Sequence, residues 1–200
     1  MPAPCRRPLA RLAAALLLVA AAAAAWAAVV VRADVTRLAE LADLVVDGTV
    51  QGRRVVHDAA TGAIWTVHRL EIRRTLSGSA PEALDVHVPG GAVAGLEQDV
   101  AGAARMAAGE RVVLFLERVA GRVQVLGEAQ GCFRVEGDAA GRLVCRNDLE
   151  GLALVDTEGR EVEAEPLRLT LAALERSVAA VVRAREEAEA RRQAAIEARL

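Results

Sequence analysis

The chain has 200 residues, of which 54% are hydrophobic and 2% aromatic, and its 25 Lys and Arg face 27 Asp and Glu. This hydrophobic content is too high for a disordered chain, and the length suits one ordinary domain with additions. Nucleic-acid binding depends on a surplus of cationic side chains and on aromatic rings for stacking. This chain has more acidic than basic residues and few aromatic ones. We therefore expect no nucleic-acid partner.

The first 33 residues have the layout of an export signal. Three Arg residues precede an apolar run at 12–31, the order of basic and hydrophobic regions in a signal peptide. We expect cleavage before Asp34, after Val31-Arg32-Ala33, with Ala25-Trp26-Ala27 as the competing cleavage motif. The run at 12–31 is also long enough to span a bilayer, so an uncleaved inner-membrane anchor is the alternative. The expected location is the periplasm or the extracellular space, with membrane contact only through an uncleaved anchor.

Residues 34–200 are acidic, with 21 Arg against 27 Asp and Glu, and they contain two cysteines. Cys132 and Cys145 flank a turn-forming cluster at 137–141 that has apolar residues on both sides, which predicts a hairpin. A turn centred between Asp138 and Ala139 places the two cysteines directly opposite each other. Because an even number of exported cysteines is most often paired, we expect a disulfide, with two reduced buried cysteines as the alternative.

The stretch 43–56 is expected to form a long, bent first strand, preceded by a short helical entry at 35–42. Its residues Leu44, Val46 and Val50 alternate with polar positions, which is the period of a half-buried strand. Gly48 interrupts this run. A glycine inside a strand marks a point where the sheet coils, and such coiling closes a small barrel.

Further strands are expected at 64–76, 84–88, 96–100, 111–119 and 122–126, ahead of the cysteine hairpin. In the first of these the apolar residues change parity, which predicts a bulge near 66–68. The strand at 84–88 ends at Pro89-Gly90-Gly91, where Gly90 and Gly91 are expected to form a turn. The segment 111–119 is the most continuously apolar, so we place it at the centre of the sheet.

After Asn147 the chain is acidic, with one more strand expected at 152–156, and then forms a C-terminal amphipathic helix. Pro166 is placed near the start of this helix, whose apolar residues are spaced three or four apart: Leu167, Leu171, Leu174, Val178 and Val181. The expected division is a signal or anchor at 1–33, a β-barrel domain at 34–158, and at 159–200 a helix whose end is solvated or frayed. The fold class is mainly β, an OB-like curved barrel, with a β-sandwich as the alternative.

Several segments together resemble an uncharacterised family of exported bacterial proteins over residues 33–147. They are Ala42-Asp43-Leu44-Val45-Val46, Gly48 and Val50, then Thr66, Leu76-Ser77-Gly78, Pro81, 86–91, 100–102 and 109–116. The same arrangement is similar to the OB-fold barrel of netrin-like and metalloprotease-inhibitor modules. Inhibitors of that kind bind the target's metal through an amino-terminal cysteine. Neither Asp34 nor Ala28 as a mature start supplies one, so the resemblance implies the barrel and not the inhibition.

His57, His68 and His87 are candidate metal ligands, because imidazole is a common zinc ligand. Their spacing is irregular and no cysteine or paired carboxylate completes a motif, so we expect neither a metal site nor a cofactor. The glycine-rich stretch 90–95 lacks the Lys and Ser/Thr of a phosphate loop. Asp47 and Asp58 are expected to be exposed, solubilising carboxylates.

The expected function is that of an exported, non-catalytic β-barrel module that binds or scaffolds an envelope or extracellular partner. Two alternatives remain open. One is a secreted enzyme or metal-binding protein that uses His68 and His87. The other is a membrane-tethered structural protein that assembles through its C-terminal helix.

Overall fold

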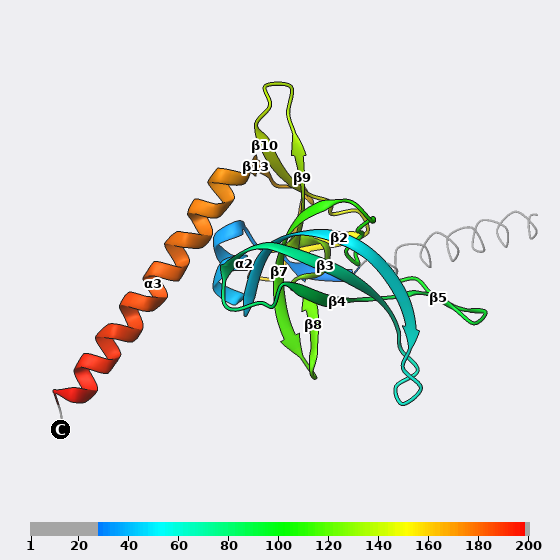
Figure 1. The fold of residues 1–200 in the computed structure, drawn as a ribbon, viewed down its shortest axis with the longest axis horizontal. Coiled ribbons are helices and arrows are strands. Elements are labelled where there is room, and N and C mark those ends of the chain that lie inside the picture. The colour runs from blue at the N-terminus through cyan, green and yellow to red at the C-terminus, as the bar shows by residue number, and fades with distance from the viewer. Residues whose placement is uncertain (1–27, 199–200) are drawn as a thin grey trace, which may run out of the picture.

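The computed structural model describes residues 28–198. The fold is mainly β, with one large sheet, two small sheets and a long C-terminal helix (Figure 1). Cys5 and most of the expected signal or anchor, residues 1–27, lie outside the described residues. Between residues 28 and 198, no helix combines the length and the apolar character that crossing a membrane requires.

The elements follow the chain in an order close to the expected one. Before the long helix they are β1 (Ala28–Val31), α2 (Val35–Leu41), β2 (Leu44–His57), β3 (Ile64–Ser77), β4 (Ala83–Pro89), β5 (Gly91–Val93), β6 (Leu96–Gln98), β7 (Arg111–Val119), β8 (Arg122–Val125), the 3-10 helix η2 (Glu128–Gly131), β9 (Cys132–Gly137), β10 (Leu143–Asn147), β11 (Leu152–Val155), β12 (Glu161–Val162) and β13 (Arg168–Thr170). The chain closes with α3 (Leu171–Glu197).

The large sheet has the strand order β13-β10-β9-β7-β2-β3-β4-β8. Strand β8 also pairs with β7, so β7, β2, β3, β4 and β8 are hydrogen-bonded in a circuit. All pairs in this circuit are antiparallel except β4 with β8, which pair in parallel through His87 and Gln124.

Strand β2 coils along its length (Figure 1), and its pairing with β3 is irregular at three places. Leu76 and Arg73 of β3 are extra residues opposite Val45–Val46 and Asp47–Gly48, and Gln51 of β2 is an extra residue between Val50 and Gly52. At Gly48 the neighbouring strand approaches closely. A Cβ there would lie 2.8 Å from the carbonyl oxygen of Glu71 on β3, which is closer than real Cβ atoms come to backbone oxygens. Glycine is required at this position by the contact between the two strands.

Two apolar clusters lie on opposite faces of β2 and β7. One lies on the face of the circuit that carries Val46, Leu114 and Val86. The other lies under the helices and includes Val45, Phe115 and residues of α2 and α3. Because both of its faces are covered, β7 is apolar at every position from Val112 to Leu116 and occupies the centre of the sheet, as expected.

The bulge predicted near 66–68 is absent from β3. Pairing with β2 is continuous from Arg69 opposite Gly52 to Ile64 opposite His57. Thr66 and His68 therefore lie on the same face as Leu70, and Trp65 and Val67 lie on the other face. The parity of the apolar residues changes because this part of β3 is covered on both faces, not because the strand switches sides.

The expected disulfide is not formed: Cys132 and Cys145 are free and buried. The hairpin exists, but its register pairs Leu143 with Gly137 and Cys145 with Val135, so the turn lies closer to the C-terminus than predicted. Asp138 organises this turn, its side chain accepting hydrogen bonds from the backbone N–H groups of Ala140 and Arg142. In consequence the two thiols point to opposite faces, Cys132 into one apolar cluster and Cys145 into the other.

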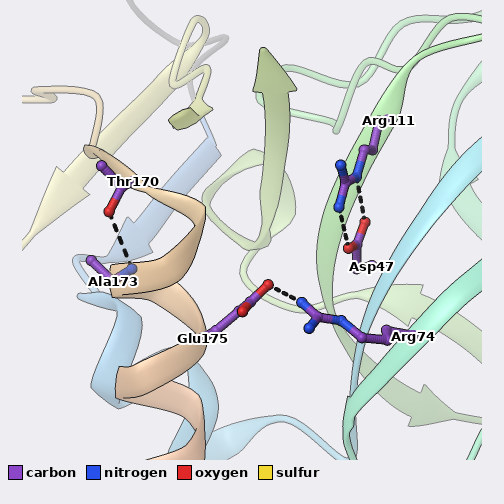
Figure 2. A network of polar contacts seen from close by, with 6 residues as sticks. All are labelled: Asp47, Arg74, Arg111, Thr170, Ala173 and Glu175. Carbon is purple, nitrogen blue, oxygen red and sulfur yellow. Dashed lines mark hydrogen bonds and ion pairs between the residues drawn. The ribbon is translucent and has the colours of Figure 1, made fainter. Parts of the chain in front are cut away.

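The C-terminal helix begins at Leu171, not near Pro166, because β13 first pairs with β10. Thr170 caps the helix by accepting a hydrogen bond from the N–H of Ala173 at 3.2 Å (Figure 2). Its buried residues are Leu171, Leu174, Val178 and Val181, four of the five residues of the predicted apolar stripe; Leu167, the fifth, precedes the helix. Farther along, Arg185 donates to the carbonyl oxygens of Ala39 and Glu40 at the end of α2, and beyond it α3 extends away from the sheets (Figure 1).

Strand β1 lies within the segment expected to be removed as a signal. It pairs in parallel with β11, from Ala28 opposite Leu152 to Val31 opposite Val155. Together with β12 these strands form a small sheet beside the large one. The described fold therefore includes residues 28–33 as well as the expected domain at 34–158.

Candidate functional site

A polar cavity of about 320 Å³ lies where β3, the end of β4 and the 98–106 segment meet. Thr66 and His68 of β3 contribute to its wall, and Arg53 of β2 lies beside them. The connection after β4 contributes Gly90 and Gly91. This is the candidate functional site, and we call it the His68 cavity.

His68 is the most deeply placed titratable group in this cavity, with 2% of its surface exposed. Its Nδ1 is buried and has no hydrogen-bond partner within residues 28–198. Burial lowers the pKa of His68 below its ordinary value, and the positive charge of Arg53 lowers it further, against a smaller opposing effect of Glu110. The imidazole is therefore neutral near pH 7, and it retains hydrogen-bonding capacity that the fold does not use.

Arg53 lies directly opposite His68 in the β2–β3 register, so the two side chains leave the sheet on the same face. Arg53 is exposed and forms no ion pair with any described residue. Arg105, also in the wall, is paired with Glu150 at 3.2 Å. An exposed carboxylate, Asp99, lines the same cavity, so its wall carries both signs of charge.

The glycine pair predicted as a turn forms part of this wall. Gly90 has φ +97° and Gly91 has φ +132°, in the region that favours glycine. The Thr66 hydroxyl donates to the carbonyl oxygen of Gly90 at 2.8 Å, and a Cβ on Gly91 would lie 2.7 Å from that hydroxyl oxygen. These two glycines let the chain cross directly over Thr66 beside His68.

A second cavity of about 230 Å³ shares Val88, Pro89 and Ala104 with the first and has a different character. It is lined by His87 and by two carboxylates, Glu117 and Glu128. Burial raises the pKa of Glu128 above its ordinary value, and the charge of Glu117 raises it further.

The three histidines do not come together. His68 lies opposite Val86, and His87 lies opposite Val67, so adjacent strands carry the two side chains to opposite faces of the sheet. His57 is exposed at the end of β2. No group of three or more His, Cys, Asp or Glu side chains suited to a metal ion occurs among the described residues. A single site that uses both His68 and His87 is incompatible with this register.

Asp47, expected to be exposed, is 1% exposed and forms a bidentate ion pair with Arg111 of β7 (Figure 2). The Nε and Nη2 atoms of Arg111 donate to its two carboxylate oxygens at 2.9 and 2.7 Å. Nearby, Arg74 of β3 forms an ion pair with Glu175 of α3, which ties the helix to the sheet (Figure 2). The sequence does not indicate that Asp47 is buried. Polar residues on this face of β2 suggest that it is exposed to solvent, but the helices cover it.

Neither a protein-family model, nor a curated protein, nor a solved structure matches this chain.

Proposed function

We propose that this protein is an exported binding module built on an OB-like barrel, and that the His68 cavity binds a small anionic group of its ligand or partner. Support for the barrel comes from the pairing circuit of β7, β2, β3, β4 and β8, with its one parallel pair. A five-stranded Greek-key barrel of the OB type contains a circuit of this kind.

The observation that carries the binding proposal is the Nδ1 atom of His68, which is buried and has no hydrogen-bond partner among the described residues. A polar atom that is buried without a hydrogen bond costs stability, so such atoms are rare unless a ligand or function uses them. Here the unpartnered Nδ1 belongs to a side chain opposite Arg53, and Arg53 forms no ion pair with any described residue. A carboxylate, sulfate or phosphate group would accept hydrogen bonds from both side chains.

The size and charge of the cavity restrict the ligand. Asp99 in the wall would repel a large or highly charged anion, so we propose a single carboxylate, sulfate or phosphate group. Nucleic acid is not the proposed partner, because the chain has a formal net charge of −2 and only 2% aromatic residues. Such a group would belong to a small ligand or to an envelope or extracellular partner.

A metal-dependent enzyme is the weaker proposal. It would have to use one histidine without the other, since His68 and His87 lie on opposite faces. In the part of the chain that the structure describes, no carboxylate hydrogen-bonds to His68 to orient it as a general base. The proposal of a tethered structural protein depends on an anchor at residues 12–31. Of these, 12–27 lie outside the described range, and 28–31 form β1.

The test is a titration with sodium sulfate, against sodium chloride at matched ionic strength, followed by the imidazole NMR signals of His68. An anion in the cavity stabilises the imidazolium, so sulfate should raise the pKa of His68. Arg53→Ala should weaken sulfate binding about tenfold or more through the loss of a charge-assisted hydrogen bond. Asp99→Asn should strengthen it by removing a repelling charge.

The matched control is Arg73→Ala, because Arg73 is an exposed arginine of β3 that does not line the cavity. Its sulfate titration should match that of the unmodified protein. A His68 pKa that does not respond to sulfate would contradict the binding proposal. Equal weakening by Arg53→Ala and Arg73→Ala would assign the effect to general charge instead of to this cavity.

A further inference from the structure

Strand β1 (Ala28–Val31) follows the alternative cleavage motif Ala25-Trp26-Ala27 in the sequence. All four of its residues are in register with β11, and the next residue continues the ladder, since the N–H of Arg32 donates to the carbonyl oxygen of Val155 at 2.8 Å. The apolar cluster between β1, β11 and β12 contains Ala28 and Val30 packed against the buried Leu152 and Leu154. Residues 28–32 thus belong to the folded unit.

A second contact ties the end of β1 and the segment after it to η2, the 3-10 helix between β8 and β9. The side-chain amide of Gln130, in η2, donates to the carbonyl oxygen of Val31 at 3.1 Å and accepts from the N–H of Ala33 at 2.9 Å. Gln130 is 2% exposed, and these are the hydrogen bonds that its side chain makes within the described chain. Cleavage before Asp34 would remove both partners and leave a buried amide unsatisfied.

We infer that the export signal is cleaved after Ala27 and that the mature protein begins at Ala28, as the first residue of β1. This inference rests on the proposed export. The sequence of the junction agrees with it, because Ala25 and Ala27 provide small residues at the third and first positions before the cut, as a signal peptidase requires. Val31-Arg32-Ala33 has the larger, branched Val31 at the third position. Of the two motifs, the one at 25–27 leaves the fold intact.

Cleavage after Ala27 makes β1 the mature amino terminus, so an exposed edge strand with the apolar side chains of Val29 and Val31 begins the exported protein. Cleavage before Asp34 would instead begin the protein at the cap of α2, where the Asp34 side chain accepts from the N–H of Arg37 at 2.7 Å. The two outcomes differ by six residues and are separated readily by intact mass.

The experiment expresses the full chain in a bacterium with an export pathway, recovers it from the periplasm and measures its amino terminus by mass spectrometry. We expect a start at Ala28. A start at Asp34 would overturn the inference and leave the proposed export standing. An intact amino terminus would overturn the proposed cleaved export itself, so the two failures are distinguishable.

Two variants give the assignment an independent control. Ala27→Leu places a bulky residue next to the proposed cut and should abolish the product that begins at Ala28. Ala33→Leu makes the matched change at the other motif. The mature protein of this variant should still begin at Ala28. If Ala33→Leu blocks processing while Ala27→Leu does not, the cut lies before Asp34 and the inference is wrong.

Discussion

Removal of Arg111 should destabilise the protein far more than removal of an exposed arginine. Asp47 is 1% exposed, and both of the hydrogen bonds to its carboxylate within the described residues come from Arg111. Breaking a buried ion pair by deleting one partner typically costs about 3–5 kcal/mol, because a charge stays buried without compensation. The Arg111 side chain is 26% exposed, so water can reach the vacated position. We therefore expect Arg111→Ala to lower the free energy of unfolding by about 3 kcal/mol, at the lower end of that range.

Arg54→Ala is the matched control. It removes an arginine that is 57% exposed and pairs with Asp85 at 2.8 Å. Asp85 keeps a second partner, because Arg69 lies 3.0 Å away. An exposed pair of this kind contributes about 1 kcal/mol or less, so this variant should unfold close to the unmodified protein.

Urea unfolding followed by circular dichroism measures both variants, with equal slopes as the check that the unfolded surface is the same. Asp47→Asn in the Arg111→Ala background should restore part of the lost stability, because it removes the uncompensated charge. If Arg111→Ala unfolds at the same urea concentration as Arg54→Ala, the Asp47–Arg111 pair contributes no more to stability than an exposed ion pair. The reasoning also fails if Asp47→Asn restores nothing.

Three further measurements test other parts of the structure. Gly48→Ala should lower the free energy of unfolding by about 1–2 kcal/mol through overlap with β3, whereas Gly52→Ala, with open space around its Cβ, should leave it unchanged or raise it slightly; equal urea midpoints would contradict this. Cys132 and Cys145, whose thiol pKa values burial raises to about 12 and about 11, should react with a thiol reagent at pH 7 only after unfolding; rapid reaction of folded protein would refute it. Burial lowers the pKa of His68, so the unfolded state takes up the proton first, and stability should fall as pH drops below about 6.5; a pH profile that His68→Gln leaves unchanged would count against this.

The strands could be predicted because they alternate or are continuously apolar, and these patterns are local. The class of the fold, mainly β with a C-terminal helix, follows from them. The start of that helix was misplaced because Pro166 is a good first-turn residue, while the pairing of β13 with β10 depends on contacts far away in the sequence. Strand β1 was not predicted, because residues 28–31 were assigned to the apolar run of the signal or anchor and their partner β11 is far away in the sequence.

The cysteine hairpin shows how a small error in a turn changes a conclusion. Its turn-forming residues allowed several centres, and the side chain of Asp138 selects one that lies nearer Arg142. Because side chains alternate across a strand, the shift sends Cys132 and Cys145 to opposite faces. Composition identified the hairpin and could not determine its register.

The candidate site was only partly visible from the sequence. His68 was singled out as a histidine, but its burial and its position opposite Arg53 follow from the register of β2 and β3. Gly90 and Gly91 were recognised as turn residues. Their contact with Thr66 depends on the tertiary structure and could not be predicted from local sequence. Asp47 was expected in solvent because nothing local indicates that helices cover its side of the sheet.

The pairing of β1 with β11 also determines when folding can finish. A chain that is synthesised from its amino terminus contains residue 28 long before residue 152, its partner in β11. The hairpin of β2 and β3 closes a short loop and can form early, but the β1–β11 contact closes a loop that spans most of the protein. Among the strands of the described residues, β1 is thus the first to be made and among the last to be paired.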